Sequence, residues 1–158
     1  MEQTLLVVTT LAVGLIGGLW FAFVVAVMPA LGRQGDRTFV DVMNEINRVI
    51  LNPVFLLTYV GALVLCLVTT VLLWDHDDLR VLLLVADLGY AVTFVGTAAA
   101  NVPLNNQLGE TTPDAGDEAM RSARTAFETS WNRWHLVRTL ATGASFVCLC
   151  LALAELNG

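Results

Sequence analysis

Four apolar stretches set the fold of this 158-residue chain, because each is about as long as a membrane is thick. They cover residues 5–31, 53–74, 79–100 and 136–156. A hydrocarbon core of about 30 Å requires roughly 20 residues of α-helix. Since lipid offers no partner to backbone N–H and C=O groups, such stretches cross the bilayer as helices. We therefore predict one all-α domain over residues 1–158, an integral membrane four-helix bundle with antiparallel up-down topology.

The composition agrees with a membrane protein and excludes several other classes. Apolar residues make up 56% of the chain and charged residues 14%, against about 45–50% and 25% in soluble domains. Twelve glycines without a period and three cysteines exclude collagen and disulfide scaffolds. Eight basic residues against fourteen acidic ones give a net charge of −6, so the chain offers no basic surface to nucleic acid.

The arginines predict the orientation in the membrane. Only Arg80 lies in the short turn between the second and third stretches, and neither terminus carries an arginine. The other seven lie in or beside the two long connections: Arg33, Arg37, Arg48, Arg121, Arg124, Arg133 and Arg138. Cytoplasmic loops carry an excess of basic residues. We therefore expect a multi-pass protein of the cell membrane with both long connections in the cytoplasm and both termini outside.

Both long connections contain amphipathic segments. In residues 36–51 the apolar positions recur at helical spacing, which predicts an amphipathic helix lying along the membrane interface. Residues 113–135 form a second amphipathic segment, and no helix breaker separates it from the fourth span. We expect the two to form one helix of about 44 residues, a cytoplasmic extension of the fourth span. Residues 107–116 are the predicted loop, and the third span is expected to end near residue 100.

Polar residues gather where the spans meet the arginine-rich connections. On the last helix a polar stripe enters lipid depth at steps of three and four: Glu128, Asn132, His135, Arg138 and Thr142. Amides flank the other helix ends: Asn44, Asn47, Asn52, Asn101 and Asn105. Such groups must face a neighbouring helix or a wet cavity, because lipid cannot satisfy them. They either cap helix ends and tie the bundle together or line a pocket.

Asp87 is the acidic residue nearest the middle of a span, and Tyr90 continues its helix face towards Asn101. No cation is expected at its depth, so it either ties two helices together or belongs to a functional site. His76 and His135 fall at opposite boundaries, which leaves no set of metal or iron–sulfur ligands, and we expect no metal or other cofactor. Gly14 and Gly18 form a GxxxG pattern that predicts close helix packing inside the bundle and leaves a homo-oligomer open.

Two motifs resemble the signature of the anthrone oxygenase family of small four-span membrane proteins. They are Asn101-Val102-Pro103-Leu104-Asn105-Asn106 and Trp131-Asn132-Arg133-Trp134-His135-Leu136-Val137-Arg138-Thr139. The segments Met43-Asn44-Glu45-Ile46-Asn47 and Asn52-Pro53-Val54-Phe55 also fit the family pattern. The chain departs from that pattern at His135, where the family's usual motif has Asn.

The resemblance implies oxygenation of a lipophilic polycyclic phenol of the anthrone type, with molecular oxygen as co-substrate and no cofactor. His135 would then act as base, while Arg138, Asn101 and Asn105 would stabilise an oxyanion. The substrate would lie among six further residues: Asn44, Asn47, Asn52, Trp20, Trp131 and Trp134. Two alternatives stay open: a non-enzymatic membrane protein that binds a lipid, a quinone or a partner subunit in the same pocket, and proton or solute translocation past Asp87.

Overall fold

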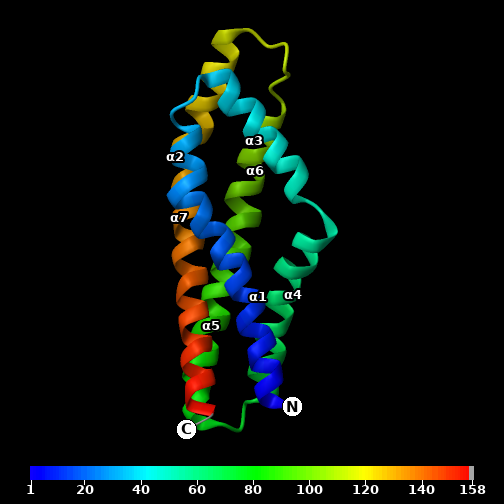
Figure 1. Ribbon diagram of the computed structural model, residues 1–158, viewed down its shortest axis with the longest axis vertical. Helices are drawn as coiled ribbons and strands as arrows, with labels where there is room; N and C mark the ends of the chain where they lie inside the picture. Colours follow the sequence, from blue (N-terminus) through cyan, green and yellow to red (C-terminus); the bar gives the residue numbers. More distant parts are fainter. Residues whose placement is uncertain (157–158) are drawn as a thin grey trace.

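The computed structural model describes residues 1–156, which fold into an all-α, four-helix membrane bundle. Both termini and the turn between α4 and α5 lie at one end (Figure 1). This confirms the predicted fold class and its antiparallel topology. The helical elements are α1 (Glu2–Ala22), the π-helical turn η1 (Phe23–Val27), α2 (Met28–Leu31), α3 (Asp36–Ile50), α4 (Pro53–Leu72), α5 (Asp77–Gly96), the π-helical turn η2 (Thr97–Asn101), α6 (Val102–Gly109) and α7 (Asp117–Leu156).

Two of the spans contain a π-helical turn followed by a proline. Pro29 and Pro103 are the second residues of α2 and α6, directly after η1 and η2. Proline lacks an N–H, and its ring crowds the carbonyl of the preceding turn. A wider i→i+5 turn makes room for that ring without ending the helix. The helix that contains the third predicted span therefore does not end near residue 100 but continues through η2 and α6 to Gly109.

The fourth span is one continuous helix, as predicted. α7 has 40 residues and starts at Asp117, four residues after the expected start at Pro113. It packs along α5 and α1 at close range. A Cβ added at Gly89 of α5 would lie 2.7 Å from the Ala141 carbonyl oxygen, and one at Gly14 would lie 2.8 Å from the Phe146 ring. The close packing expected of the GxxxG pattern is thus found at Gly14 but not at Gly18, which is exposed and where an added Cβ would meet nothing within 4 Å.

The amphipathic helix predicted in residues 36–51 exists as α3, but protein covers its apolar face. Phe39, Val40 and Met43 are fully buried and belong to a core shared with α6 and α7. Figure 1 shows α3 descending beside the bundle towards α4. The apolar stripe that the sequence indicates therefore closes the arginine-rich end of the molecule.

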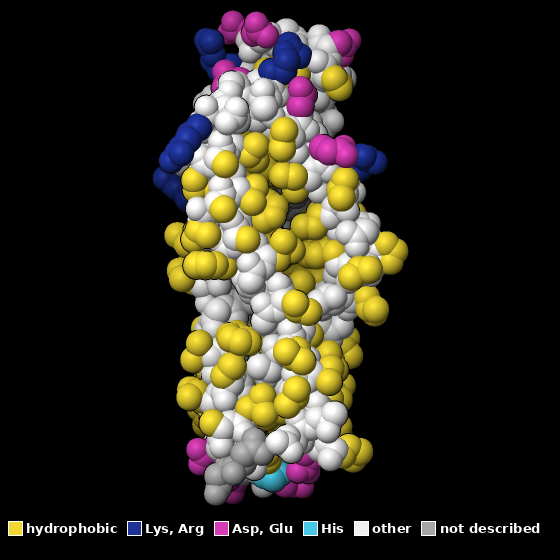
Figure 2. Space-filling view, viewed as in Figure 1, with side chains coloured by type: hydrophobic (Ala, Val, Ile, Leu, Met, Phe, Trp, Pro, Cys, Tyr) yellow, Lys and Arg dark blue, Asp and Glu magenta, His cyan; other side chains and the backbone are white. Residues whose placement is uncertain are grey.

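Two arginines fasten the connections at this end. Arg124 of α7 donates to the carbonyl oxygens of Gly32 and Gln34 at 2.9 and 2.8 Å, and it pairs with Asp36 and Glu128. Arg37 of α3 donates to two carbonyl oxygens of the loop before α7. On the face drawn in Figure 2, charged side chains lie at the lower end and in the upper part of the molecule, and the middle is covered by apolar side chains. This distribution fits lipid contact along the sides of the bundle.

Candidate functional site

Part of the predicted polar stripe of α7, His135 and Arg138, lies in a buried cluster where α1, η1 and η2 converge. The start of the stripe lies outside it, because Glu128 pairs with Arg124 and Asn132 lines a groove between α2 and α7. Arg138 is 5% exposed, and its guanidinium carbon lies 4.0 Å from the ring centroid of Trp20 and 5.2 Å from that of Trp131. Both indoles are themselves almost fully buried. A guanidinium over two indole faces gains cation–π attraction that is strongest where water is excluded.

His135 holds the arginine in this position. Arg138 Nε donates to His135 Nδ1 at 2.9 Å, and His135 Nε2 lies 3.0 Å from the Trp20 carbonyl oxygen. An arginine N–H can only donate, so Nδ1 is an acceptor and Nε2 carries the proton that it gives to Trp20. The ring also stacks on Trp131 at a centroid distance of 4.6 Å. Both nitrogens of the neutral imidazole are therefore committed to orienting Arg138.

The guanidinium carries its charge without an acidic partner. Its Nη1 donates to Thr97 Oγ1 at 3.3 Å. None of the ion pairs formed among residues 1–156 involves Arg138. Buried charges in proteins are ordinarily paired, because desolvation of an unpaired ion is costly. Arg138 is therefore a fixed positive charge in an otherwise neutral, aromatic environment.

Two of the predicted asparagines position Trp131. Asn105 Oδ1 accepts the indole N–H of Trp131 at 2.8 Å, and Asn101 Nδ2 donates to the Trp131 carbonyl oxygen at 3.3 Å. Asn101 is fully buried, and its Oδ1 has no partner. Asn101 is the last residue of η2, and Asn105 reaches α7 because the helix continues past Pro103 as α6 instead of ending there. Both amides thus lie at the cluster, and their hydrogen bonds go to Trp131 rather than to Arg138.

The other predicted site residues lie further out. Asn52 caps α4, with its Oδ1 accepting from the Phe55 N–H at 3.0 Å. Asn44 donates to the Leu108 carbonyl oxygen at 3.4 Å, and Asn47 lies beside it on the same face of α3. Trp134 is 47% exposed on the outer side of α7. The structure therefore assigns a capping role to Asn52 and brings Trp20, but not Trp134, to Arg138.

Three hollows lie near this cluster, each lined by at least one residue that contacts it: Phe23 and Phe55, His135, or Asn105. An apolar groove of about 470 Å³ is lined by Leu19, Phe23, Ile46, Val49, Ile50 and Phe55, together with the side chains of Glu45 and Asn52. On the face drawn in Figure 2, a hollow lies among apolar side chains where α1 diverges from α3 and α4. His135 lines a second groove of about 400 Å³ between α2 and α7. A polar pocket of about 750 Å³ between α3 and α6 contains Asn44, Asn47 and Asn105.

The rim of the apolar groove is charged. Arg48 Nε donates to Glu45 Oε2 at 2.9 Å, and this bond lowers the pKa of the Glu45 carboxyl below its ordinary value. The pair is exposed and lies at the end of α3 nearest the groove. The one acidic side chain among the described residues of this groove is therefore neutralised by an ion pair.

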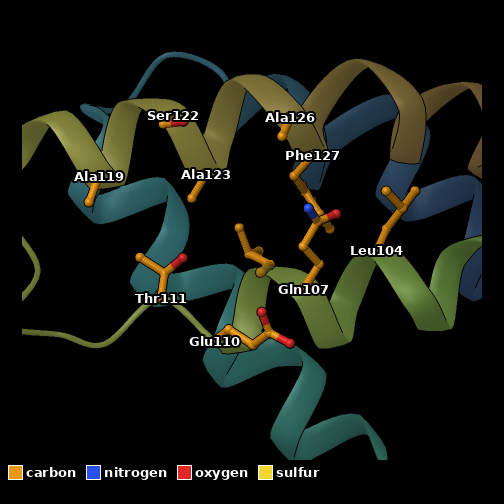
Figure 3. A pocket seen from close by; sticks show the side chains of 10 residues that line it. Leu104, Gln107, Glu110, Thr111, Ala119, Ser122, Ala123, Ala126 and Phe127 are labelled. Carbon is orange, nitrogen blue, oxygen red and sulfur yellow. The ribbon is translucent and has the colours of Figure 1, made fainter.

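A fourth hollow lies away from the cluster. Figure 3 shows a crevice in which Ala119, Ser122 and Ala123 of α7 face Gln107 and Thr111 across a gap. Its volume is about 320 Å³, and it contains none of the predicted site residues. This crevice belongs to the arginine-rich end rather than to the buried cluster.

Several residues of the cluster were not predicted. Phe23 lies 5.8 Å from His135 and 6.2 Å from Trp131, ring centroid to ring centroid. Phe55 stacks on Tyr59 at 5.4 Å and contacts Trp20 at 6.1 Å. Phe55 belongs to the segment Asn52-Pro53-Val54-Phe55, which fits the family pattern, so the sequence did indicate it. Phe23 also had a signal, because it follows Trp20 by three residues, a helical spacing that places both side chains on one face of the first span.

Asp87 lies apart from this group. It is half-buried on α5 and faces Thr70 and Cys66 of α4. Tyr90 instead donates to the Tyr59 carbonyl oxygen at 2.9 Å, one helix turn nearer the cluster. Asp87 and Tyr90, which the sequence places on one helix face, thus contact α4 at two different places.

The fold and the cluster define a class: a four-span helical membrane protein with a buried arginine, histidine and two indoles at one end of the bundle. The family model described as anthrone oxygenase matches residues 53–148, which is more than half of the chain. The chain therefore belongs to the anthrone oxygenase family, as its motifs indicated. The matched region contains η2 and the whole of 131–138. Neither a curated protein nor a solved structure gave a match.

Proposed function

We propose that this protein is a membrane-embedded oxygenase that needs no cofactor and acts on a lipophilic polycyclic phenol of the anthrone type. The family membership supports the reaction class. The observation that carries the proposal is the unpaired guanidinium of Arg138, fixed over two indole faces that contact Phe23 and Phe55 in the wall of an apolar groove. A flat, oxygen-bearing aromatic molecule complements each of these features.

The reaction uses the reactivity of the substrate itself. The benzylic CH₂ of an anthrone loses a proton, and the resulting electron-rich carbanion, which is also a phenolate, transfers an electron to dioxygen. One oxygen atom then becomes the new ring carbonyl, and the other leaves as water with the two hydrogens of the CH₂. The protein has to stabilise the oxyanion, hold the ring system flat and exclude water.

Each residue of the cluster has a place in this scheme. Arg138 stabilises the oxyanion, and Trp20 and Trp131 supply aromatic faces for the ring system. Asn101 and Asn105 hold Trp131 in place. The role of His135 is to orient Arg138, because its Nδ1 would be free to take a substrate proton only if Arg138 Nε released it.

The test is turnover of 1,8-dihydroxyanthrone by the purified protein in phosphatidylcholine nanodiscs. Oxygen uptake and anthraquinone formation are followed together, with empty nanodiscs measuring spontaneous oxidation. We expect turnover by the wild type, a loss of most of it in Arg138→Ala and His135→Ala, and wild-type rates in the exposed control Arg133→Ala. Unchanged turnover in both cluster variants would exclude this assignment.

A second candidate function is the binding of a lipid or quinone without turnover. One observation favours it: the groove of about 470 Å³ opens on the side of the bundle and has mainly apolar walls. Mass spectrometry of the purified protein distinguishes the two functions. A co-purified isoprenoid or acyl chain, together with no turnover of the anthrone, would favour the binding protein.

A further inference from the structure

We propose that the cluster binds its ligand as an oxyanion, a phenolate or enolate held against Arg138, and so selects the deprotonated form. This inference rests on the proposed function for the aromatic nature of the ligand. It deepens that function by naming the charge state in which the ligand is bound. Deprotonation would then accompany binding, with the proton released to water, and no side chain of the site would have to accept it.

The charge balance around Arg138 carries this inference. Trp20 approaches it from α1, Tyr59 from α4 and Thr97 from η2, while His135 and Trp131 lie on α7 itself. All five are neutral. Three carboxyl groups on neighbouring segments are engaged elsewhere. Glu45, at the rim of the apolar groove, pairs with Arg48. Glu128 binds Arg124 at 2.7 Å, ten residues and roughly 15 Å back along α7, and Asp87 faces α4.

The donors of the cluster also outnumber its acceptors. Arg138 has five N–H groups, and hydrogen bonds to His135 and Thr97 use two of them. The indole Nε1 of Trp20 is buried without a partner in the ring over which the guanidinium lies. Charge-assisted bonds to an oxyanion are about twice as strong as neutral ones. An anionic oxygen would therefore complement both the net charge and the free N–H groups.

One acceptor is also unused. Asn101 Oδ1 is buried without a partner on the side of the cluster formed by η2. A hydroxyl group next to the anionic oxygen could donate to it. The combination suits a flat phenolate that carries a second, protonated hydroxyl, which is the pattern of a polyphenol deprotonated once.

The experiment measures the ionisation of a bound probe that cannot be turned over. 7-Hydroxycoumarin is flat, and its absorption changes when its phenol ionises. It is titrated with pH in nanodiscs holding excess protein and in empty nanodiscs. We expect the wild type to lower the midpoint by at least about one pH unit, which is a tenfold preference for the anion. A midpoint equal to that in empty nanodiscs would overturn the inference.

Variants locate the effect. Arg138→Gln should return the midpoint to its value in empty nanodiscs, Arg138→Lys should keep a lowered midpoint because it keeps the charge, and Arg133→Gln should match the wild type. A lowered midpoint that persists in Arg138→Gln would overturn the inference.

A second measurement needs only the wild type, so its result does not depend on whether a variant folds. The affinity for 7-hydroxycoumarin should rise at least tenfold as its phenol ionises, while that for 7-methoxycoumarin should not change with pH. Equal pH dependence of the two would contradict anion selection. A shifted probe without anthrone turnover would support the inference and refute the oxygenase; turnover without a shifted probe would do the reverse.

Discussion

Arg138 and His135 act as one unit at the scale of single residues. The imidazole accepts from the guanidinium and donates to a backbone carbonyl of α1, so it fixes the arginine relative to two helices at once. Hydrogen bonds to charged groups contribute about 1.5–3 kcal/mol each. Removal of the imidazole should therefore loosen the guanidinium rather than remove its charge.

This leads to a prediction for position 135. His135→Ala should lower the rate of anthrone turnover about tenfold to a hundredfold, because the bond that orients Arg138 is lost. His135→Asn should keep more activity than the alanine variant, since an amide oxygen at this position can still accept from Arg138 Nε. Steady-state oxygen uptake measures both. Equal rates in the alanine and wild-type proteins would show that the imidazole does not position the arginine.

Residue type alone does not reveal which asparagines matter. Asn52 and Asn101 both stand near a helix boundary in the sequence, yet Asn52 is an exposed cap and Asn101 is fully buried against Trp131. The sequence places both at the end of a span, and only the tertiary packing separates them. The polar stripe of α7 was predictable because helical spacing fixes which of its residues share a face.

At the scale of helical elements, the two π-helical turns allow the first and third spans to continue past a proline. Each inserts a wider turn before a proline, and the helix beyond it is rotated relative to a regular α-helix. Phe23 and Asn101 belong to these turns and both contact Trp131. A proline in the sequence predicts a helix end, so the continuation of the helix from α5 through η2 and α6 to Gly109 could not be predicted from the sequence, whereas Phe23 follows Trp20 at regular helical spacing.

The contact between α5 and α7 gives a second prediction. Gly89→Ala would place a Cβ 2.7 Å from the Ala141 carbonyl oxygen, so the helices must separate. We expect a loss of about 1–3 kcal/mol in the free energy of unfolding, as for other overpacked sites. Gly61→Ala of α4, where a Cβ meets nothing within 4 Å, should be neutral or slightly stabilising. Thermal unfolding in detergent compares the two. A destabilised Gly61→Ala with an unaffected Gly89→Ala would contradict the packing described for α5 and α7.

At the scale of the whole molecule, the two ends of the bundle differ in construction. The end with the termini has one short turn, whereas the other end is built from α3, α6 and the first turns of α7 (Figure 1). The arginines that the sequence places in the two long connections include those that fasten this end together. The sequence therefore predicts the bundle and the difference between its two ends. It does not predict that protein covers the apolar face of α3, because that depends on tertiary packing.

Arg124 offers a test of that construction. Arg124→Ala removes bonds to two backbone carbonyls and leaves Asp36 and Glu128 without their partner. We expect the free energy of unfolding to fall by about 1–3 kcal/mol, and less in high salt, since the carboxylates are partly exposed. Arg133→Ala, on the exposed side of the same helix, should change it by less than about 0.5 kcal/mol. Chemical unfolding at two salt concentrations measures both; equal stabilities would show that Arg124 does not fasten the α2–α3 connection.

The central claim concerns chemistry driven by the substrate at Arg138, and isotope labelling tests it most directly. The protein in nanodiscs is supplied with 1,8-dihydroxyanthrone and ¹⁸O₂, and the mass of the anthraquinone is measured by mass spectrometry as it forms. We predict one labelled oxygen atom in each product molecule, formed by the wild type at a rate that falls at least about a hundredfold in Arg138→Gln. An unlabelled product, or equal rates in the two proteins and in empty nanodiscs, would contradict the account.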